Sequence, residues 1–413
     1  MSNPKFTSLY DPSQARSRSG SFIAGSTCSE VPASGSGGAI GFTPSSLKAP
    51  TNGFQSLTEF VATMNETEIP GPHLQMRVHE GKYLGQGAQF QVYGQRHGVS
   101  WVPFLIDQPY IDHRAKVWRW RYGSDPIDLA IKRTIFKLPA YSGQEHTLGF
   151  GSPQQLHDFQ LEVMALCRPL LRSHRNIVKL LAWGLDYDPK PSGQFVSPIS
   201  PILIVEYANC SMRQLLARDV PVPVLVRQKL CFDVCNAVSA LHQCGIVHGD
   251  IKTDNILIFP AEKAERHCVA KLSDFGLSVA EEQVKSSHPR SYRGLGTEGW
   301  QAPELTRVGN VVSVEDLPKC DLYSLGLVIW SVILGDGGCP LKGSADRKKQ
   351  ALNVASSFVH ASGLPGLTRE SLRAILEQLL QEEPCKRVSS LKGICERLQV
   401  ASDVCPTSVA DEW

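Results

Sequence analysis

The chain reads GIVHGDIKTDNILIF at residues 245–259 and, after a variable connector, VAKLSDFG at residues 269–276. The apolar runs 256–259 and 269–272 are typical of short strands, and polar side chains occupy the turns beside them. The polar side chains are those of His248, Asp250, Lys252, Asn255 and Asp274. Carboxylate and carboxamide oxygens are ligands for magnesium, and a lysine can offset the charge of a phosphoryl group in transfer. These two stretches therefore predict a site for magnesium and phosphate chemistry.

Both stretches resemble the catalytic loop and the DFG turn of the eukaryotic protein kinases. A chance match by two polar loops of an unrelated α/β protein is the alternative, and further motifs along the chain weigh against it. The resemblance covers about residues 80–398. It implies an α+β, two-lobed protein-kinase fold. The N-lobe, at about 80–205, is a small antiparallel β-sheet with one main helix; a hinge follows at 206–210, and the larger, mostly helical C-lobe at about 211–398.

The rest of the chain is predicted to form tails. Residues 1–55 are rich in Ser, Gly and Pro with few large apolar side chains, so burial cannot offset the entropy of ordering them, and we predict disorder. A lead-in segment of unknown role follows at 56–79, with one short helix or strand at 57–64. Residues 399–413 lack periodicity and are predicted to be a C-terminal tail.

Composition narrows the classes of partner and the compartment. A net charge of +2 gives no global field that favours nucleic acid or an anionic membrane, so we expect neither as a partner. The twelve cysteines include no CxxC pair and are typical of free thiols in a reducing compartment. The longest apolar run, 322–334, is too short to cross a bilayer, and no signal-peptide pattern follows Met1. We therefore expect an intracellular, cytoplasmic protein.

A glycine-containing turn precedes the first lysine motif. Residues 82–94 read KYLGQGAQFQVYG, in which Gly85 and Gly87 would let the backbone approach phosphates without an obstructing Cβ. The resemblance adds Val92 to the nucleotide site. Kinases often have a third glycine where this chain has Phe90, which leaves the nucleotide affinity open. The aromatic stretch 93–128 is predicted to be an ordered insertion that extends the strands; alternatively, this glycine turn is accidental.

The resemblance implies a catalytic role for each charged group. Lys132, in LAIK at 129–132, would hold the α- and β-phosphates of ATP and would itself be held by Glu162. A solvated helix glutamate is the simpler interpretation of Glu162, but the order FxxEVxAL and then HRNIVKLL, at 159–166 and 174–181, resembles the kinases. Asp250 would accept the proton of the substrate hydroxyl, and Lys252 would pair with the γ-phosphate. The implied Mg²⁺ ligands are Asn255 and Asp274.

The adenine site is implied by the apolar strand ILIVEYA at 202–208. By resemblance this strand ends in the hinge, where backbone groups of Glu206 and Ala208 bond the adenine ring. Ala130 and Leu257 would line the same site.

Several C-lobe residues have implied structural roles. Arg387 is placed to pair with Glu304 of GTEGWQAPE, which resembles the end of a kinase activation segment. Asp321 matches the aspartate that ties a central helix to the catalytic loop, although an acidic helix cap is the simpler interpretation. His248 would pack against Phe275 as support for the turn.

Three functions fit these motifs. The first is a serine/threonine kinase acting on protein substrates, because Lys252 and Thr297 together resemble that class. The second is a pseudokinase or nucleotide-binding scaffold, suggested by the altered glycine turn and by Gly249. A small-molecule kinase is the third, and the segment 296–304 with Arg387 weighs against it. The sequence leaves the oligomeric state unknown.

Gly249 generates a regulatory prediction. It replaces the arginine of the usual HRD motif, which neutralises a phosphate on the activation segment. We therefore expect phosphatase treatment to leave turnover largely unchanged, as measured by steady-state rates before and after treatment. Loss of turnover with the fold intact would contradict this. Candidate phosphorylation sites are Ser286, Ser287, Ser291 and Tyr292, near the alternative positive charges Arg290 and Arg293.

Overall fold

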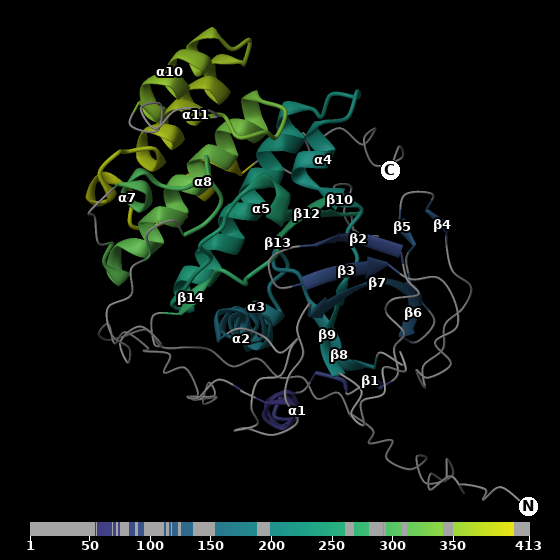
Figure 1. Ribbon diagram of the computed structural model, residues 1–413. Helices are drawn as coiled ribbons and strands as arrows, with labels where there is room; N and C mark the ends of the chain where they lie inside the picture. The colour runs from purple at the N-terminus through teal and green to yellow at the C-terminus, as the bar shows by residue number, and fades with distance from the viewer. Residues whose placement is uncertain are drawn as a thin grey trace, which may run out of the picture. The chain divides into compact units, whose positions relative to one another are not determined.

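A computed structural model of the chain (Figure 1) shows two connected lobes within one compact unit, residues 48–413. The structure describes residues 54, 56–67, 69–71, 73–74, 82–86, 90–94, 111–112, 115–116, 118–122, 125–134, 153–187, 199–260, 268–280, 292, 295–307, 312–341 and 350–399. Most of the predicted tails 1–55 and 399–413 lies outside these ranges, as do Gly87 and the serines and arginines of 286–293. Phe54 is described and is buried in the core, so the prediction of disorder is wrong at this residue.

In the part of the chain that the structure describes, the N-lobe contains a seven-stranded sheet with the order β1-β8-β9-β7-β3-β2, in which β6 also pairs with β7. Its pairings are antiparallel except that β1 runs parallel to β8. The strands are β1 (His73–Leu74), β2 (Lys82–Gln86), β3 (Phe90–Gly94), β6 (Trp118–Tyr122), β7 (Asp125–Thr134), β8 (Leu180–Tyr187) and β9 (Ile199–Glu206). The predicted small β-sheet lobe is therefore present.

The insertion does extend the strands where the structure describes it. β6 pairs with the first half of β7, from Tyr122 opposite Asp125 to Trp118 opposite Leu129. β3 pairs with the second half of β7, so that β6 continues the line of β3 along one strand. Two short strands, β4 (Ile111–Asp112) and β5 (Ala115–Lys116), form a separate ladder before β6.

The main helix of the N-lobe is α2 (Pro153–Cys167), followed by α3 (Pro169–Arg172). The sequence spaces Phe159, Val163, Leu166 and Leu170 as one helical face, and the first three are buried. Leu170 is 70 % exposed, because α2 ends at Cys167 and Leu170 lies on α3. The lead-in segment also joins this core through α1 (Leu57–Asn65), a helix whose N-cap Ser56 accepts a hydrogen bond from the Glu59 amide. The folded domain therefore includes residues that precede its predicted start at 80.

The C-lobe is mostly helical and has short antiparallel ladders at its junction with the N-lobe (Figure 1). Its helices are α4 (Met212–Leu216), α5 (Val224–Gln243), α7 (Pro303–Thr306), α8 (Leu317–Leu334), α10 (Ala351–Ala361), α11 (Gly366–Leu379) and α12 (Lys392–Leu398). Short 3-10 turns lie at η3 (Thr253–Asn255), η4 (Val314–Asp316) and η5 (Pro384–Lys386). The ladders are formed by β10 (Cys210–Ser211), β11 (Ile246–Val247), β12 (Ile256–Phe259), β13 (Val269–Leu272) and β14 (Val279–Ala280).

The central helix α8 is longer than its apolar run at 322–334, because it begins at Leu317 with Pro318 in its first turn. Its length and composition would suffice to cross a membrane, but 83 % of its residues are buried inside the domain. Asp321 therefore lies within the helix, and the interpretation of this residue as a helix cap is wrong: the N-cap is Asp316.

A buried ion pair joins the end of the activation segment to the C-terminal part of the lobe. Arg387 donates to both carboxylate oxygens of Glu304, at 2.6 and 2.9 Å, and the two side chains are 0 % and 4 % exposed. The Arg387 guanidinium also lies 4.9 Å from the ring centre of Tyr323. The pair predicted from the sequence is therefore present and desolvated.

We predict that Arg387→Ala lowers the free energy of unfolding by about 3–5 kcal/mol, because it leaves the Glu304 carboxylate buried without its partner. Urea denaturation measures the loss. Arg373→Ala is the matched control, since Arg373 and Glu377 form an exposed pair on α11 and its loss costs below about 0.5 kcal/mol. Equal effects of the two substitutions would contradict the assigned role of Arg387.

Candidate active site

Strand pairing brings the two sequence motifs together. β12 and β13 are antiparallel, with Ile256 opposite Leu272. Asn255, just before β12, therefore lies beside Ser273, just after β13. The Ser273 amide and hydroxyl both donate to the Asn255 carbonyl, at 3.0 and 2.9 Å. This pairing places Asp274, the next residue, beside the catalytic loop.

Asp274 has φ 66°, the left-handed region that aspartate tolerates better than most residues. Its side chain is 43 % exposed, and its Oδ1 lies 3.7 Å from Nζ of Lys132 on β7. Lys132 also forms an ion pair with Glu162 of α2. The second oxygen of Glu162 accepts a hydrogen bond from the Phe275 amide. Lys132, Glu162 and Asp274 thus converge, from a strand, a helix and a turn.

Two carboxylates keep Lys132 charged. Burial disfavours the ammonium form, but the charges of Glu162 and Asp274 and their hydrogen bonds raise the pKa of Lys132 above its usual 10.5. A lysine in this setting presents a permanent positive charge to an anionic ligand.

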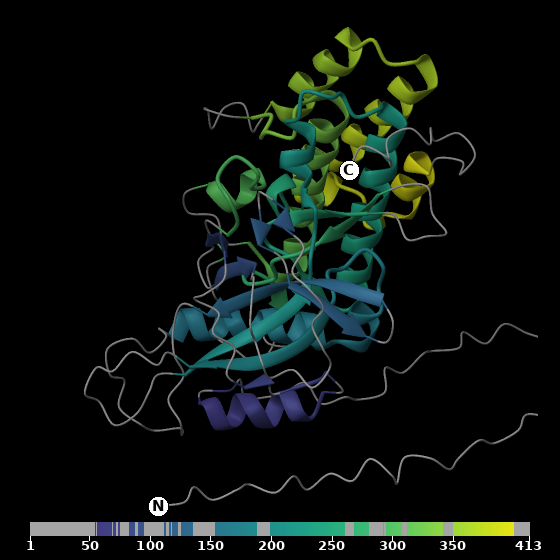
Figure 2. The ribbon, with the colours of Figure 1, turned by 90° about the vertical axis from the view of Figure 1, so that its right-hand side faces the viewer.

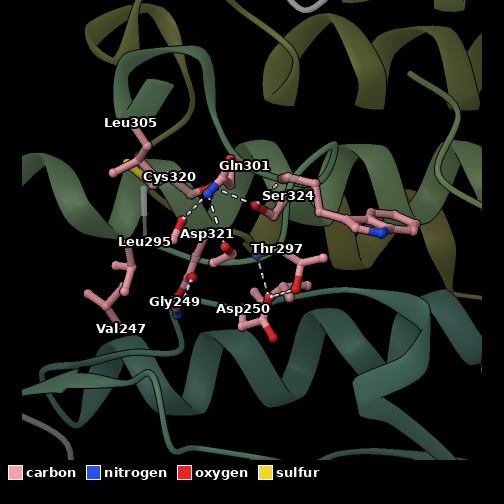
Figure 3. A pocket seen from close by; sticks show the side chains of 13 residues that line it. Val247, Gly249, Asp250, Leu295, Thr297, Gln301, Leu305, Cys320, Asp321 and Ser324 are labelled. Carbon is pink, nitrogen blue, oxygen red and sulfur yellow. Dashed lines mark hydrogen bonds between the residues drawn. The ribbon is translucent and has the colours of Figure 1, made fainter. Parts of the chain in front are cut away.

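Both oxygens of the Asp250 carboxylate accept hydrogen bonds, and Figure 3 shows the side that faces Thr297. Its Oδ1 accepts hydrogen bonds from the Thr297 amide and hydroxyl, at 2.9 and 2.7 Å. Its Oδ2 accepts from Lys252 Nζ at 2.6 Å and from Asn255 Nδ2 at 3.0 Å. Lys252 also donates to the Thr297 hydroxyl at 2.7 Å. The catalytic loop and the activation segment therefore share one polar network centred on Asp250.

The catalytic loop rests on Asp321 of α8. The Asp321 carboxylate accepts hydrogen bonds from the His248 and Gly249 amides, at 2.7 and 3.0 Å, and contacts His242 Nε2 at 2.9 Å. The His248 ring accepts from the Asp250 amide through Nδ1, so its Nε2 carries the proton and donates to the Ser273 carbonyl. His248 also packs on Phe275, with ring centres 5.3 Å apart. His248 thus supports the turn and has no free nitrogen for proton transfer.

Gly249 is required by a close backbone contact. It has φ +79°, and a Cβ at this position would lie 2.4 Å from the Leu277 carbonyl oxygen. The start of the activation segment is also tied down by the ladder of β14 with β11, which pairs Ala280 with Ile246. The start of the activation segment therefore packs on the catalytic loop through backbone contacts. The backbone of Leu277 occupies the space that an arginine side chain at position 249 would need.

The hinge has a partner that sequence reasoning missed. Both oxygens of Glu206 accept from Lys271 Nζ, at 2.7 and 2.6 Å, and Lys271 lies 4.6 Å from the ring centre of Phe259. The Glu206 amide donates to the Lys179 carbonyl, and the Lys179 amide donates back to the Glu206 carboxylate. The hinge is thus fixed to β13, the strand that leads into Asp274. The predicted adenine contact Ala208 is half-buried beside it.

The other predicted nucleotide residues lie on neighbouring strands. Ala130 is buried on β7 opposite Val205, and Leu257 is half-buried on β12. In the backbone pairing, Val92 lies opposite both Gly85 and Lys132, which puts the strands of the glycine turn next to the lysine strand.

The donor set fits a magnesium ion that is shared with a phosphate ligand. Asn255 uses its Nδ2 to donate to Asp250, which leaves its Oδ1 oxygen for a cation, and the Asp274 carboxylate is partly exposed. Among the described residues no group of three His, Cys, Asp or Glu side chains could hold a metal alone. Mg²⁺ typically binds one or two protein oxygens together with phosphates and water, and the two donors here match that pattern.

A small cavity of about 10 Å³ lies between the catalytic loop and the activation segment, near Gly249, Thr297 and Asp321 (Figure 3). This volume holds about one water molecule. It is therefore not a binding pocket for a substrate.

Asp250 generates a prediction about pH. Burial would raise its pKa, but hydrogen bonds from Lys252 and Thr297 and the Lys252 charge lower it below 3.8. A depressed folded pKa stabilises the fold at every pH above 3.8, and this contribution is lost as the pH falls through the folded pKa. The difference in unfolding free energy between wild type and Asp250→Asn should therefore stay constant from neutral pH to about 5 and shrink below that range. Denaturation curves across this range test it, and a difference already shrinking near neutral pH would contradict it.

Comparison with known proteins agrees with this geometry. The chain matches the protein kinase domain family over residues 157–399, more than half of its length, and the match begins after Lys132. It is 27 % identical to a probable serine/threonine-protein kinase of Dictyostelium discoideum, 28 % to serine/threonine-protein kinase TOS3 of Saccharomyces cerevisiae, and 27 % to serine/threonine-protein kinase Kist of Pongo abelii. These alignments cover 57 %, 55 % and 60 % of this chain, but 22 %, 41 % and 57 % of the three relatives. With its two lobes, catalytic loop and DFG turn arranged as described, the chain belongs to the protein kinase family.

Proposed function

We propose that the chain is a serine/threonine-protein kinase that transfers the γ-phosphoryl group of ATP to hydroxyl groups of protein substrates. The observation that carries this proposal is the convergence of Lys132 with Glu162 and Asp274. This arrangement joins a charged lysine to a partly exposed carboxylate across the two lobes. In kinases the lysine at this place binds the phosphates of ATP. The position of Lys132 beside Asp274 is therefore suited to an anionic ligand that binds between the two lobes.

The described residues support a division of labour at the site. Bound Mg²⁺ and ATP would supply the phosphoryl group and the charge that offsets it. Lys132 would bind the α- and β-phosphates, while Asn255 and Asp274 would hold the cation. The hinge, fixed by the Glu206–Lys271 pair, would present its backbone to the adenine ring.

Asp250 is the group proposed to receive the proton of the acceptor hydroxyl. Both of its oxygens already accept two hydrogen bonds, so an incoming hydroxyl must displace a donor at one of them. The Thr297 hydroxyl is the donor best able to turn away, because rotation of the Thr297 side chain leaves the hydrogen bond from the Thr297 backbone amide to Asp250 intact. Lys252 would then neutralise the charge of the transferring group.

The second candidate, a nucleotide-binding scaffold without catalysis, draws on the altered glycine turn and on Gly249. Gly249, however, has a structural reason in the close approach of the Leu277 carbonyl, and does not signal decay of the site. The polar network around Asp250 is complete, which favours catalysis over the scaffold.

We further propose that the protein acts inside the cell, in the cytoplasm. The ten cysteines that the structure describes are free thiols, which supports a reducing compartment.

The three relatives compared above are named serine/threonine-protein kinases, which supports a protein as the substrate of this chain.

The test is transfer of radiolabelled phosphate from ATP to a generic basic protein by wild type and by Asp274→Asn. Asparagine tolerates the positive φ of residue 274, so the variant should fold and lose about 10²-fold or more of the turnover, because a metal ligand is lost. Asp219→Asn, which changes an exposed carboxylate of the C-lobe, is the control and should match wild type. Transfer that survives Asp274→Asn would overturn the metal assignment. If wild type transfers nothing yet binds ATP, the scaffold is the function.

A further inference from the structure

The lead-in segment before the kinase lobe packs directly on the helix that carries Glu162. Four aromatic rings form one buried cluster: Phe54, which directly precedes the lead-in, Phe60 of α1, Phe159 of α2 and Trp183 of β8. Phe54 and Phe60 lie 5.3 and 5.4 Å from Phe159 by ring centres, and Phe60 lies 5.5 Å from Trp183 in an edge-on arrangement. Figure 2 shows α1 alongside the sheet and α2. Such contacts favour one fixed position of α2.

Hydrogen bonds to backbone carbonyls hold Phe54 on α2 and residues 69–70 on β8. Gln160 of α2 is buried and donates through Nε2 to the Phe54 carbonyl at 2.8 Å. Trp183 donates through its amide to Pro70 and through Nε1 to Ile69, at 3.0 and 3.3 Å. β1 then adds to the sheet beside β8. The segment therefore bridges α2 and the sheet.

The contacts on α2 lie immediately before Glu162, the partner of Lys132. Phe159 precedes Glu162 by three residues, about one helical turn, and Gln160 precedes it by two. Glu162 is 1 % exposed and must reach Lys132 on β7 and the Phe275 amide at the same time. A shift of α2 by about one ångström would break these two contacts, because hydrogen bonds tolerate only a narrow range of distance.

We propose that residues 54–74 are a built-in positioning element, which holds α2 so that Glu162 keeps Lys132 in its working position. Phe54 and Phe60 are positioning residues in this element, since they act through Phe159 and Glu162. The inference rests on the proposed kinase function, because its effect is on the site for ATP. It assigns the lead-in a part in the reaction beyond that of a stabilising cover.

The first experiment replaces Phe60 in the full chain. Phe60→Ala should lower kcat/KM for ATP by about tenfold, because Lys132 loses its fixed position, and Phe60→Leu should restore most of it. Asn65→Ala changes an exposed residue of the same helix and should have no effect. Ile394→Ala is the matched control for lost stability, since Ile394 is 0 % exposed on α12 of the C-lobe. It should lower the melting temperature without lowering kcat/KM at a temperature where the chain is folded.

A double-mutant cycle then separates positioning from general stability. In a Glu162→Gln background the glutamate that the lead-in positions is already gone, so Phe60→Ala should cost less than about twofold in kcat/KM. The same cycle is run on the affinity for Mg²⁺ and a non-hydrolysable ATP analogue, which needs no turnover.

The outcomes distinguish this inference from the proposed function. An equal loss from Phe60→Ala in both backgrounds, or an equal loss from Ile394→Ala, would overturn the positioning role. Wild type that binds the analogue but transfers no phosphate would defeat the kinase proposal, while the binding cycle would still decide the role of the lead-in.

Discussion

A lysine shared by two carboxylates is the interaction on which the site depends. Lys132 comes from the N-lobe sheet, Glu162 from the helix beside that sheet, and Asp274 from a turn of the C-lobe. Because the Phe275 amide also donates a hydrogen bond to Glu162, the same carboxylate links Lys132 to the DFG turn. The two lobes are therefore joined through charged groups that lie where an anionic ligand could bind. Since Glu162 is on α2, its contacts with Lys132 and with the Phe275 amide both depend on the position of this helix.

The C-lobe holds its half of the site with buried polar groups and not with apolar packing alone. Asp321 organises the backbone of the catalytic loop from within α8, and Arg387 fixes the end of the activation segment. Each of these charges is desolvated and fully hydrogen-bonded, so moving either would expose a costly unpaired group. These hydrogen bonds hold the catalytic loop and the end of the activation segment in fixed positions on the C-lobe.

The sequence predicted the parts of the site that lie in short motifs, since Asp250, Lys252, Asn255 and Asp274 stand at fixed spacing beside strands. The pairs Lys132–Glu162 and Glu304–Arg387 followed only from resemblance, because no local pattern links residues so far apart. The Glu206–Lys271 pair was missed for the same reason. The packing of Phe54 and Phe60 was also missed. Their ring partners lie on α2 and β8, far away in the sequence, and no pattern within residues 54–65 indicates them.

The contact at Gly249 limits how this chain can vary. Any side chain at that position would bring a carbon to 2.4 Å from the Leu277 carbonyl, so an arginine can enter only if residues 277–280 move away from β11. Changes in the two segments must accordingly arrive together. A lineage that acquired phosphate-dependent control at this point would have to rebuild the opening of its activation segment in the same step.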